Sequence, residues 1–141
     1  MEFISESYEE TLDFAAKLDF EAGSVICLYG DLGAGKTAFV QGLAKGLGVE
    51  EYITSPTFTI VNVYESGKLP LYHFDMYRLA DSDEAYEIGY EEYVYGNGIS
   101  VIEWPENIAD ILPENRYDII ISKDNDKGVD FRRINVTRIE K

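Results

Sequence analysis

The sequence predicts a single α/β domain in which helices flank a central sheet of mixed parallel and antiparallel strands. A continuous apolar run over residues 25–29 leads through a glycine-rich turn into an amphipathic segment, which is typical of a parallel sheet. Two pairs of β-branched and aromatic runs, each separated by a polar turn, indicate antiparallel hairpins. The 141 residues are 45% hydrophobic, enough for one core, and no repeat or linker divides them, so we assign residues 1–141 to one domain.

The first third of the chain predicts two helices around one buried strand. Residues 7–10 read Ser-Tyr-Glu-Glu, a capping box, and apolar residues follow at helical spacing, so we expect a helix over 8–20. The strand over 25–29 is apolar throughout, as in strands that are covered on both faces. A second helix is expected over 38–47, and Gly48 ends it.

The rest of the chain predicts strands that alternate with short helices. Pro56 favours extended backbone at the preceding residue and prevents a helix there. Polar turns at 66–68 and 124–128 join the strands of the two hairpins. The expected strands are 58–65, 69–77, 99–103, 117–122 and 131–139. The expected helices are 81–88, capped by Asp81 or Ser82, and 105–112, opened by Pro105.

The turn after the first expected strand carries the most specific motif. It matches the phosphate-binding pattern G-x-x-x-x-G-K-[ST] at every fixed position, in the required place between strand and helix, with Gly30, Asp31, Leu32, Gly33, Ala34, Gly35, Lys36 and Thr37. The glycines let successive backbone N–H groups face an anion at a helix N-terminus. Lys36 would bind the β- and γ-phosphates, and the Thr37 hydroxyl would bind magnesium. The sequence therefore predicts a P-loop NTPase-like fold.

The composition is strongly acidic. Asp and Glu number 27 against 12 Lys and Arg, so the formal net charge is −15. Such a surface repels phosphate backbones and anionic lipids, which argues against unaided nucleic-acid binding and against membrane docking. A bound anion must therefore be held locally, and a glycine-rich turn with one lysine can do this.

Several other chemistries are excluded by the residue counts. One cysteine permits no intramolecular disulfide, and one histidine provides no histidine pair for zinc. There is no apolar run of 18 or more residues, and the acidic N-terminus is unlike a secretory signal. We expect a cytoplasmic protein without a membrane segment.

Nucleotide-hydrolysing proteins with this motif usually hold magnesium with a second, acidic residue at the end of another strand. Asp75 and Glu103 both qualify, because each ends an apolar-rich run and would lie at the carboxyl edge of the sheet. Spacing alone does not rank them.

Four blocks together closely resemble the TsaE (YjeE) family of bacterial ATPases, in the same order over nearly the whole chain. They are the glycine-rich motif at 30–37, Ser-Pro-Thr-Phe at 55–58, Tyr-His-Phe-Asp-Met-Tyr-Arg-Leu at 72–79 and Glu-Trp at 103–104. The resemblance implies binding of Mg²⁺ and ATP, with hydrolysis that is weak in the isolated protein. It further implies action with the TsaB–TsaD pair in threonylcarbamoyladenosine modification of adenosine 37 in tRNA, with tRNA contacted only indirectly.

The resemblance also implies roles for individual residues. Thr37 and Glu103 would be the magnesium ligands, and Lys36 would bind phosphates. Asp75 would orient water or act as a switch near the γ-phosphate, and Trp104 would lie close to the nucleotide.

Further residues are weaker candidates. Thr57 resembles a loop threonine that senses the γ-phosphate or its magnesium. The alternative interpretation is that it only caps the next strand. Arg78 could neutralise charge during phosphoryl transfer, although a surface ion pair is the more ordinary interpretation. Thr11 and Arg133 match positions near the adenine only loosely. His73 is interpreted as a packing or hydrogen-bonding residue within its strand.

Three other functions share parts of this pattern. A small-molecule or nucleotide kinase, the main alternative, would need an arginine-bearing lid, and this chain has five arginines, three of them in its last expected strand. A GTPase would need an N-K-x-D box, which is absent from the sequence. A sensor that binds nucleotide without hydrolysing it would share the motif, and phosphate release would distinguish it from an enzyme.

Overall fold

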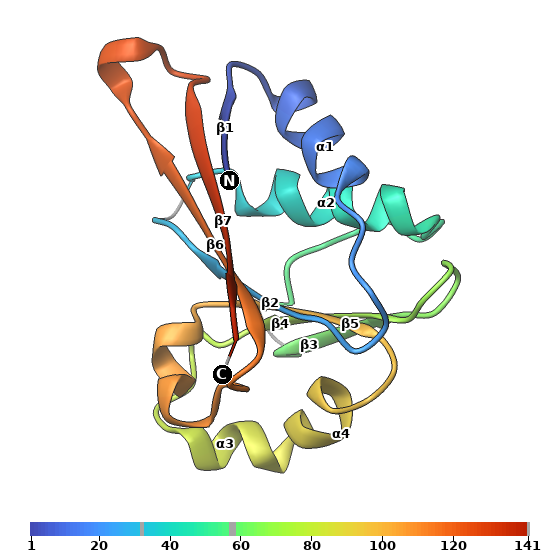
Figure 1. Cartoon of the computed structure of the whole chain (residues 1–141). Coiled ribbons are helices and arrows are strands. Elements are labelled where there is room, and N and C mark those ends of the chain that lie inside the picture. The colour runs from blue at the N-terminus through green and yellow to red at the C-terminus, as the bar shows by residue number, and fades with distance from the viewer. Residues whose placement is uncertain (32, 57–58, 141) are drawn as a thin grey trace.

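A seven-stranded sheet forms the centre of the computed structural model, which describes residues 1–31, 33–56 and 59–140 (Figure 1). Its strand order is β1-β7-β6-β2-β5-β4-β3. The four central strands run parallel to one another and comprise β6 (Arg116–Lys123), β2 (Val25–Tyr29), β5 (Ile99–Glu103) and β4 (Leu71–Asp75). The antiparallel strands lie outside them and comprise β3 (Val61–Tyr64), β7 (Arg132–Ile139) and β1 (Glu2–Ser5). The predicted single α/β domain with a mixed sheet is confirmed.

Both predicted hairpins form, as β3–β4 and β6–β7. The first is shorter than expected, because the backbone turns before it. Ile60 has φ +70°, and its N–H donates to the Pro56 carbonyl at 3.0 Å, so β3 begins only at Val61. The turn of the second hairpin contains a short 3₁₀ helix, η2 (Asn125–Lys127).

Besides η2, two elements were not predicted. The N-terminal strand β1 pairs with β7, a partner more than 120 residues away, so its short acidic sequence carries no local signal. A helix α4 (Tyr90–Val94) follows α3 (Ser82–Glu87) directly, with Gly89 between them at φ +83°. Gly89 follows the predicted helix α3 and ends it, as expected. Asp81 is the N-cap of α3, and its side chain accepts a hydrogen bond from the Glu84 N–H.

The helices near the N-terminus largely follow the prediction. Helix α1 (Tyr8–Lys17) is capped by the Ser7 hydroxyl, but it ends before residue 20 because Leu18 is extended. Helix α2 (Lys36–Leu47) ends at Gly48 and begins two residues earlier than expected. The segment predicted as a helix over 105–112 is instead a 3₁₀ helix, η1 (Pro105–Ile111), because Ile108 has non-helical backbone angles.

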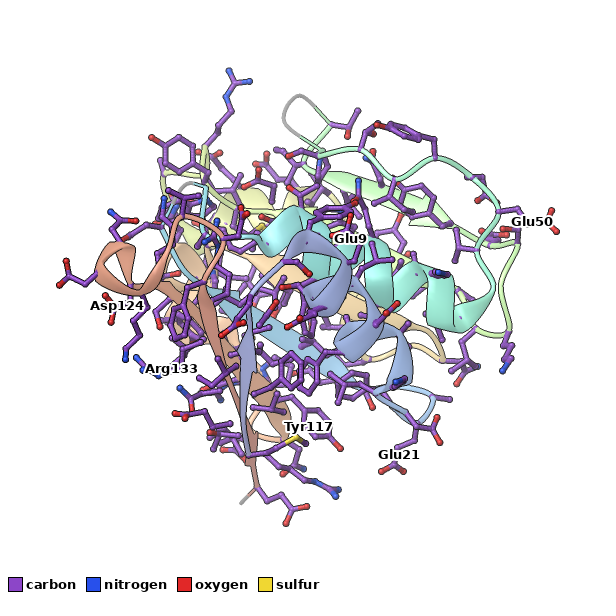
Figure 2. The ribbon with its side chains drawn as sticks, turned by 90° about the horizontal axis from the view of Figure 1, so that it is seen from above. Glu9, Glu21, Glu50, Tyr117, Asp124 and Arg133 are labelled. Atoms are coloured by element: carbon purple, nitrogen blue, oxygen red, sulfur yellow. The ribbon has the colours of Figure 1, made fainter. Side chains whose placement is uncertain are left out.

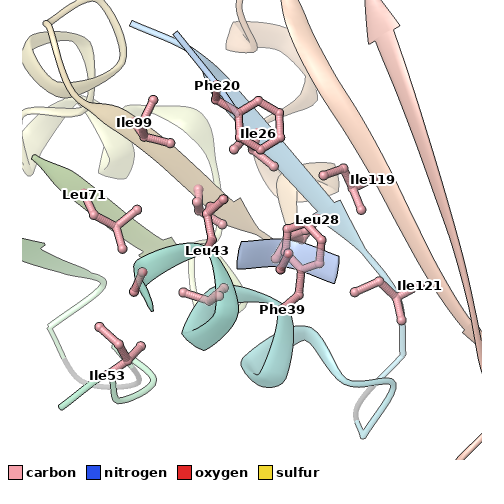
Figure 3. Close-up of a cluster of buried hydrophobic side chains, with 14 of the residues drawn as sticks. Phe20, Ile26, Leu28, Phe39, Leu43, Ile53, Leu71, Ile99, Ile119 and Ile121 are labelled. Carbon is pink, nitrogen blue, oxygen red and sulfur yellow. The ribbon is translucent and has the colours of Figure 1, made fainter. Parts of the chain in front are cut away.

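Two apolar clusters cover the two faces of the sheet. Helices α1 and α2 lie on one face, and α3, α4 and η1 lie on the other (Figure 1). Figure 3 shows Phe39 and Leu43 of α2 against the buried aliphatic side chains of the central strands. Burying these strands on both faces fixes the sheet, and with it the loops at its carboxyl edge. Within the described ranges, no helix is long and apolar enough to cross a membrane.

Candidate functional site

The glycine-rich turn connects the end of β2 to the start of α2. Gly30, Gly33 and Gly35 have φ angles of +158°, +78° and +103°, and the last of these, at the helix cap, favours glycine strongly. Helix α2 has no side-chain cap, so its first N–H groups are left to other acceptors. Leu32 lies outside the described residues. Such a turn can hold an anion with backbone groups alone.

A cleft of about 440 Å³ opens beside this turn. Elements far apart in the sequence contribute to its lining, which consists of Tyr8, Gly33, Gly35, Lys36, Thr37, Ala38, Gln41, Ser55, Asp75, Glu103 and Trp104. The cleft therefore brings together the motif, both strand-end carboxylates and the tryptophan that the sequence singled out.

Lys36 is the cation of this cleft. Although it is a lysine, only 6% of it is exposed, and its Nζ atom lies 4.2 Å from the centre of the Trp104 ring. Trp104 has left-handed backbone angles, φ +56° and ψ +49°. The centre of its ring lies 5.0 Å from the centre of the Tyr77 ring. A cation over an aromatic face is attracted by the ring electrons, so this contact holds the lysine in place.

The two acidic candidates end neighbouring parallel strands. Asp75 of β4 is in register with Glu103 of β5, and both line the cleft. Burial raises the pKa of Asp75, and the nearby Glu103 raises it too, while the hydrogen bond from the Tyr77 N–H (3.0 Å) acts in the opposite direction. Glu103 is 6% exposed, and its Oε2 lies 2.5 Å from Nε2 of His73.

The remaining predicted residues lie in different places. Thr37 lines the cleft from the first turn of α2. Thr11 is buried, with its hydroxyl 2.7 Å from that of Ser5, and lines a second cavity of about 200 Å³ beside Gly35. Arg78 is exposed and does not line the described cleft. Thr57 lies outside the described residues.

Arg133 and its neighbour Arg132 point to different surroundings. Nε of Arg133, which is labelled in Figure 2, lies 3.7 Å from a carboxylate oxygen of Glu2 in the neighbouring strand β1. Arg132 instead donates to the Gly33 carbonyl at 3.3 Å and lines the cavity beside Gly35. Adjacent residues of a strand face opposite sides, so the register of β7 selects Arg132 as the arginine at the turn.

Other residues at the cleft were also missed. Tyr8 of α1 lines both cavities, and its hydroxyl hydrogen-bonds the Gln41 side chain of α2. Neither residue belongs to a ligand-binding motif, and only the packing of α1 against α2 brings them together. The capping box could have placed Tyr8 at a helix start but not beside the cleft.

The oxygen donors of the cleft suit magnesium. They are the Thr37 hydroxyl and the Asp75 and Glu103 carboxylates, and Mg²⁺ prefers oxygen ligands and completes its shell with water and phosphates. In the part of the chain that the structure describes, no group of three His, Cys, Asp or Glu residues could hold a metal by itself. A magnesium ion held by these oxygens would need further ligands from water or from a bound anion.

The surrounding charge does not supply the attraction for such an anion. Acidic side chains such as Glu21, Glu50 and Asp124 project outward at separate places on the surface (Figure 2). The glycine-rich turn, Lys36 and the start of α2 favour an anion in the cleft, and Arg132, whose guanidinium donates to the Gly33 carbonyl, adds a positive charge beside the turn.

Fold and site together define an α/β protein whose glycine-rich, lysine-bearing turn faces two carboxylates at the carboxyl edge of a mixed sheet. The family model described as threonylcarbamoyl adenosine biosynthesis protein TsaE matches residues 5–134. The chain therefore belongs to the TsaE family, as the sequence blocks predicted.

Individual relatives agree with this assignment. The tRNA threonylcarbamoyladenosine biosynthesis protein TsaE of Treponema pallidum is 50% identical over 124 residues, which are 86% of this chain and 90% of that protein. The protein of the same name from Bacillus subtilis is 45% identical over 117 residues, 83% of this chain and 71% of that one. The crystal structure of Bacillus subtilis YdiB has a TM-score of 0.79 and 37% identity, covering 99% of this chain and 85% of that chain.

Proposed function

We propose that this chain is a magnesium-dependent ATPase that acts in tRNA threonylcarbamoyladenosine biosynthesis together with a TsaB–TsaD pair. The observation that carries the proposal is the position of Lys36, buried at the glycine-rich turn and in the same cleft as Asp75 and Glu103. The pathway assignment comes from the names of the relatives. The core would thus be P-loop NTPase-like, as the motif predicts.

In the proposed complex, the backbone N–H groups of residues 33–37 bind the phosphates of ATP. Lys36 leaves the Trp104 ring and pairs with the β- and γ-phosphates. Thr37 and Glu103 hold magnesium, which when bound neutralises charge on the phosphates. Trp104 then lies beside the nucleotide.

Asp75 has a different proposed role. It lies in the cleft, with one oxygen held by the Tyr77 N–H, so its orientation is fixed. Its raised pKa makes it a better proton acceptor than an ordinary aspartate. We assign it to orienting the attacking water, and Thr57 to sensing the γ-phosphate.

The adenine and ribose require a pocket next to the phosphates. The cavity beside Gly35 adjoins the cleft, since Tyr8, Gly35 and Ala38 line both. Thr11 lines this cavity, so we assign it a position near the adenine, as the family resemblance implies. Arg132 is better placed there than Arg133, whose guanidinium lies beside Glu2.

The test is phosphate release from Mg-ATP by the purified chain, alone and with a TsaB–TsaD pair. Lys36→Ala is the inactive variant, and Lys45→Ala, an exposed lysine on the same helix, is its matched control. We expect slow release that rises with the pair, is lost in Lys36→Ala and is unchanged in Lys45→Ala.

Other results would revise the proposal in distinct ways. Release that is the same with and without the pair would overturn the partnership while leaving the ATPase. Tight ATP binding without release under any condition would indicate a nucleotide sensor or, if adding a small phosphoryl acceptor consumes ATP, a kinase. Equal activity of Lys36→Ala and the wild type would overturn the site itself.

A further inference from the structure

His73 and Glu103 form a buried pair behind the cleft. Their exposed fractions are 1% and 6%, and Nε2 of His73 lies 2.5 Å from Oε2 of Glu103. They come from the neighbouring strands β4 and β5, where His73 is in register with Val101, two residues before Glu103. Both side chains lie on the sheet face that α2 covers, because Leu71 and Ile99 of the same alternating sets pack into that cluster.

The surroundings of the imidazole identify its protonated nitrogen. Nδ1 is buried and has no hydrogen-bond partner among the described residues. A proton on Nδ1 would leave a buried N–H donor unpaired and would turn the Nε2 lone pair toward a carboxylate oxygen, and both arrangements are costly. We therefore assign the proton to Nε2, which donates it to Glu103.

This hydrogen bond restricts what Glu103 can do. Because Oε2 accepts the hydrogen bond from His73, the carboxylate is held in one orientation, and Oε1 is the oxygen that this bond leaves fully available to a ligand in the cleft. Asp75 is held differently, by a backbone N–H of Tyr77 in its own loop, so the hydrogen bond of His73 fixes Glu103 and not Asp75.

We propose that His73 is a positioning residue that orients Glu103 for the magnesium ion of a bound nucleotide. The inference rests on the proposed function, because it assigns a purpose to the Glu103 ligand. Hydrogen bonds from a second layer of residues fix the rotamer of a metal-binding side chain, and their removal typically weakens metal affinity about 10–100-fold. A histidine that only fills the core would have no such selective effect.

Two substitutions separate positioning from packing. In His73→Gln the amide nitrogen can reach the position of Nε2 and still donate to Glu103, whereas in His73→Asn it lies nearer the position of Nδ1 and cannot. ATP affinity is measured by calorimetry for the wild type and both variants, with Mg²⁺ and with EDTA. We expect His73→Asn to lose about tenfold or more of its magnesium-dependent affinity, His73→Gln to keep most of it, and the magnesium-free affinities to agree within about twofold.

The outcomes distinguish the inference from the function on which it rests. Wild-type magnesium dependence that survives in both variants would overturn the positioning role and leave the proposed ATPase intact. Equal losses of ATP affinity with and without Mg²⁺ would also overturn the positioning role, since they would indicate a general disturbance of the cleft. A wild type that does not bind Mg-ATP would overturn both.

A second measurement needs no substitution and applies if His73→Asn does not fold. The chain contains one histidine, so ¹⁵N-histidine labelling yields the signals of a single ring. We expect the Nε2–H form of the ring, retained when Mg²⁺ and a non-hydrolysable ATP analogue bind. Protonation at Nδ1 alone, or loss of the Nε2–H signal on binding, would overturn the inference.

Discussion

Nζ of Lys36 lies 4.2 Å from the centre of the Trp104 ring, so the cation of the glycine-rich turn is held by the residue that follows β5. The contact joins two residues of the cleft lining that are 68 positions apart in the sequence. It keeps a nearly buried lysine over an electron-rich surface. A phosphate in the cleft would compete with the ring for the same ammonium group.

Trp104 is the only tryptophan, so its fluorescence reports this contact directly. We expect Mg-ATP to change the emission in a saturable manner, because Lys36 leaves the ring when it pairs with phosphate. Lys36→Ala should have an altered emission before nucleotide is added and no further response, and Lys45→Ala should behave like the wild type. A normal ATP response in Lys36→Ala would contradict this view of the cleft.

The two carboxylates of the cleft should respond differently to truncation. Glu103→Ala is expected to reduce magnesium-dependent ATP affinity by about tenfold or more, because it removes a proposed ligand. Asp75→Ala should have a smaller effect on that affinity and a larger effect on phosphate release. A magnesium titration of nucleotide binding for both variants measures this, and the opposite order would exchange their roles.

Asp75 should also make stability depend on pH. Burial raises its pKa above the ordinary value of 3.8, so the folded chain binds this proton more readily than the unfolded chain. Stability is therefore lost as pH rises from about 3.8 through the higher folded pKa, and the penalty persists at neutral pH. We expect Asp75→Asn, which keeps the acceptor for the Tyr77 N–H, to be more stable than the wild type at pH 7.

Urea unfolding of both proteins from pH 7 down toward the ordinary aspartate pKa of 3.8 measures this effect, and the difference should shrink toward the acidic end. Asp13→Asn, on the exposed face of α1, controls for the loss of one negative charge from an acidic protein. An Asp75→Asn protein that is no more stable at pH 7 than Asp13→Asn would refute the prediction.

Gly42 sets the distance between α1 and α2. A Cβ atom there would lie 2.3 Å from the Leu12 carbonyl oxygen and 2.9 Å from Cβ of Ala15. Alanine is favoured in helices by about 1 kcal/mol over glycine, but overpacking of this kind costs typically about 1–3 kcal/mol. Because the obstacle is backbone, we expect Gly42→Ala to lower the free energy of unfolding.

Urea denaturation of Gly42→Ala measures the loss, with Lys45→Ala as a substitution at an exposed position of the same helix. The variant should also weaken ATP binding, since Tyr8 and Gln41 line the cleft from the two helices that would be forced apart. Unchanged stability would show that α1 shifts freely over α2.

Most strands and helices could be predicted because their signals are local. The buried strand at 25–29, the glycine-rich turn and the helix after it are each encoded within a few residues, so hydrophobic period and capping identify them. Thr37 followed from the motif itself, and Asp75 and Glu103 followed as unranked candidates because the ends of parallel strands meet at one edge of a sheet. Strand β1 and helix α4 could not be found in this way, because pairing with β7 and the turn at Gly89 decide them.

The sequence by itself thus determined the type of fold, the glycine-rich turn and the family. Tertiary structure alone decided that Arg132 rather than Arg133 reaches the turn, that Trp104 covers Lys36, and that His73 holds Glu103. These are contacts between residues 30 or more positions apart. They depend on strand register and on the direction of each side chain from its strand, and a shift of one residue in register would reverse which face each side chain occupies.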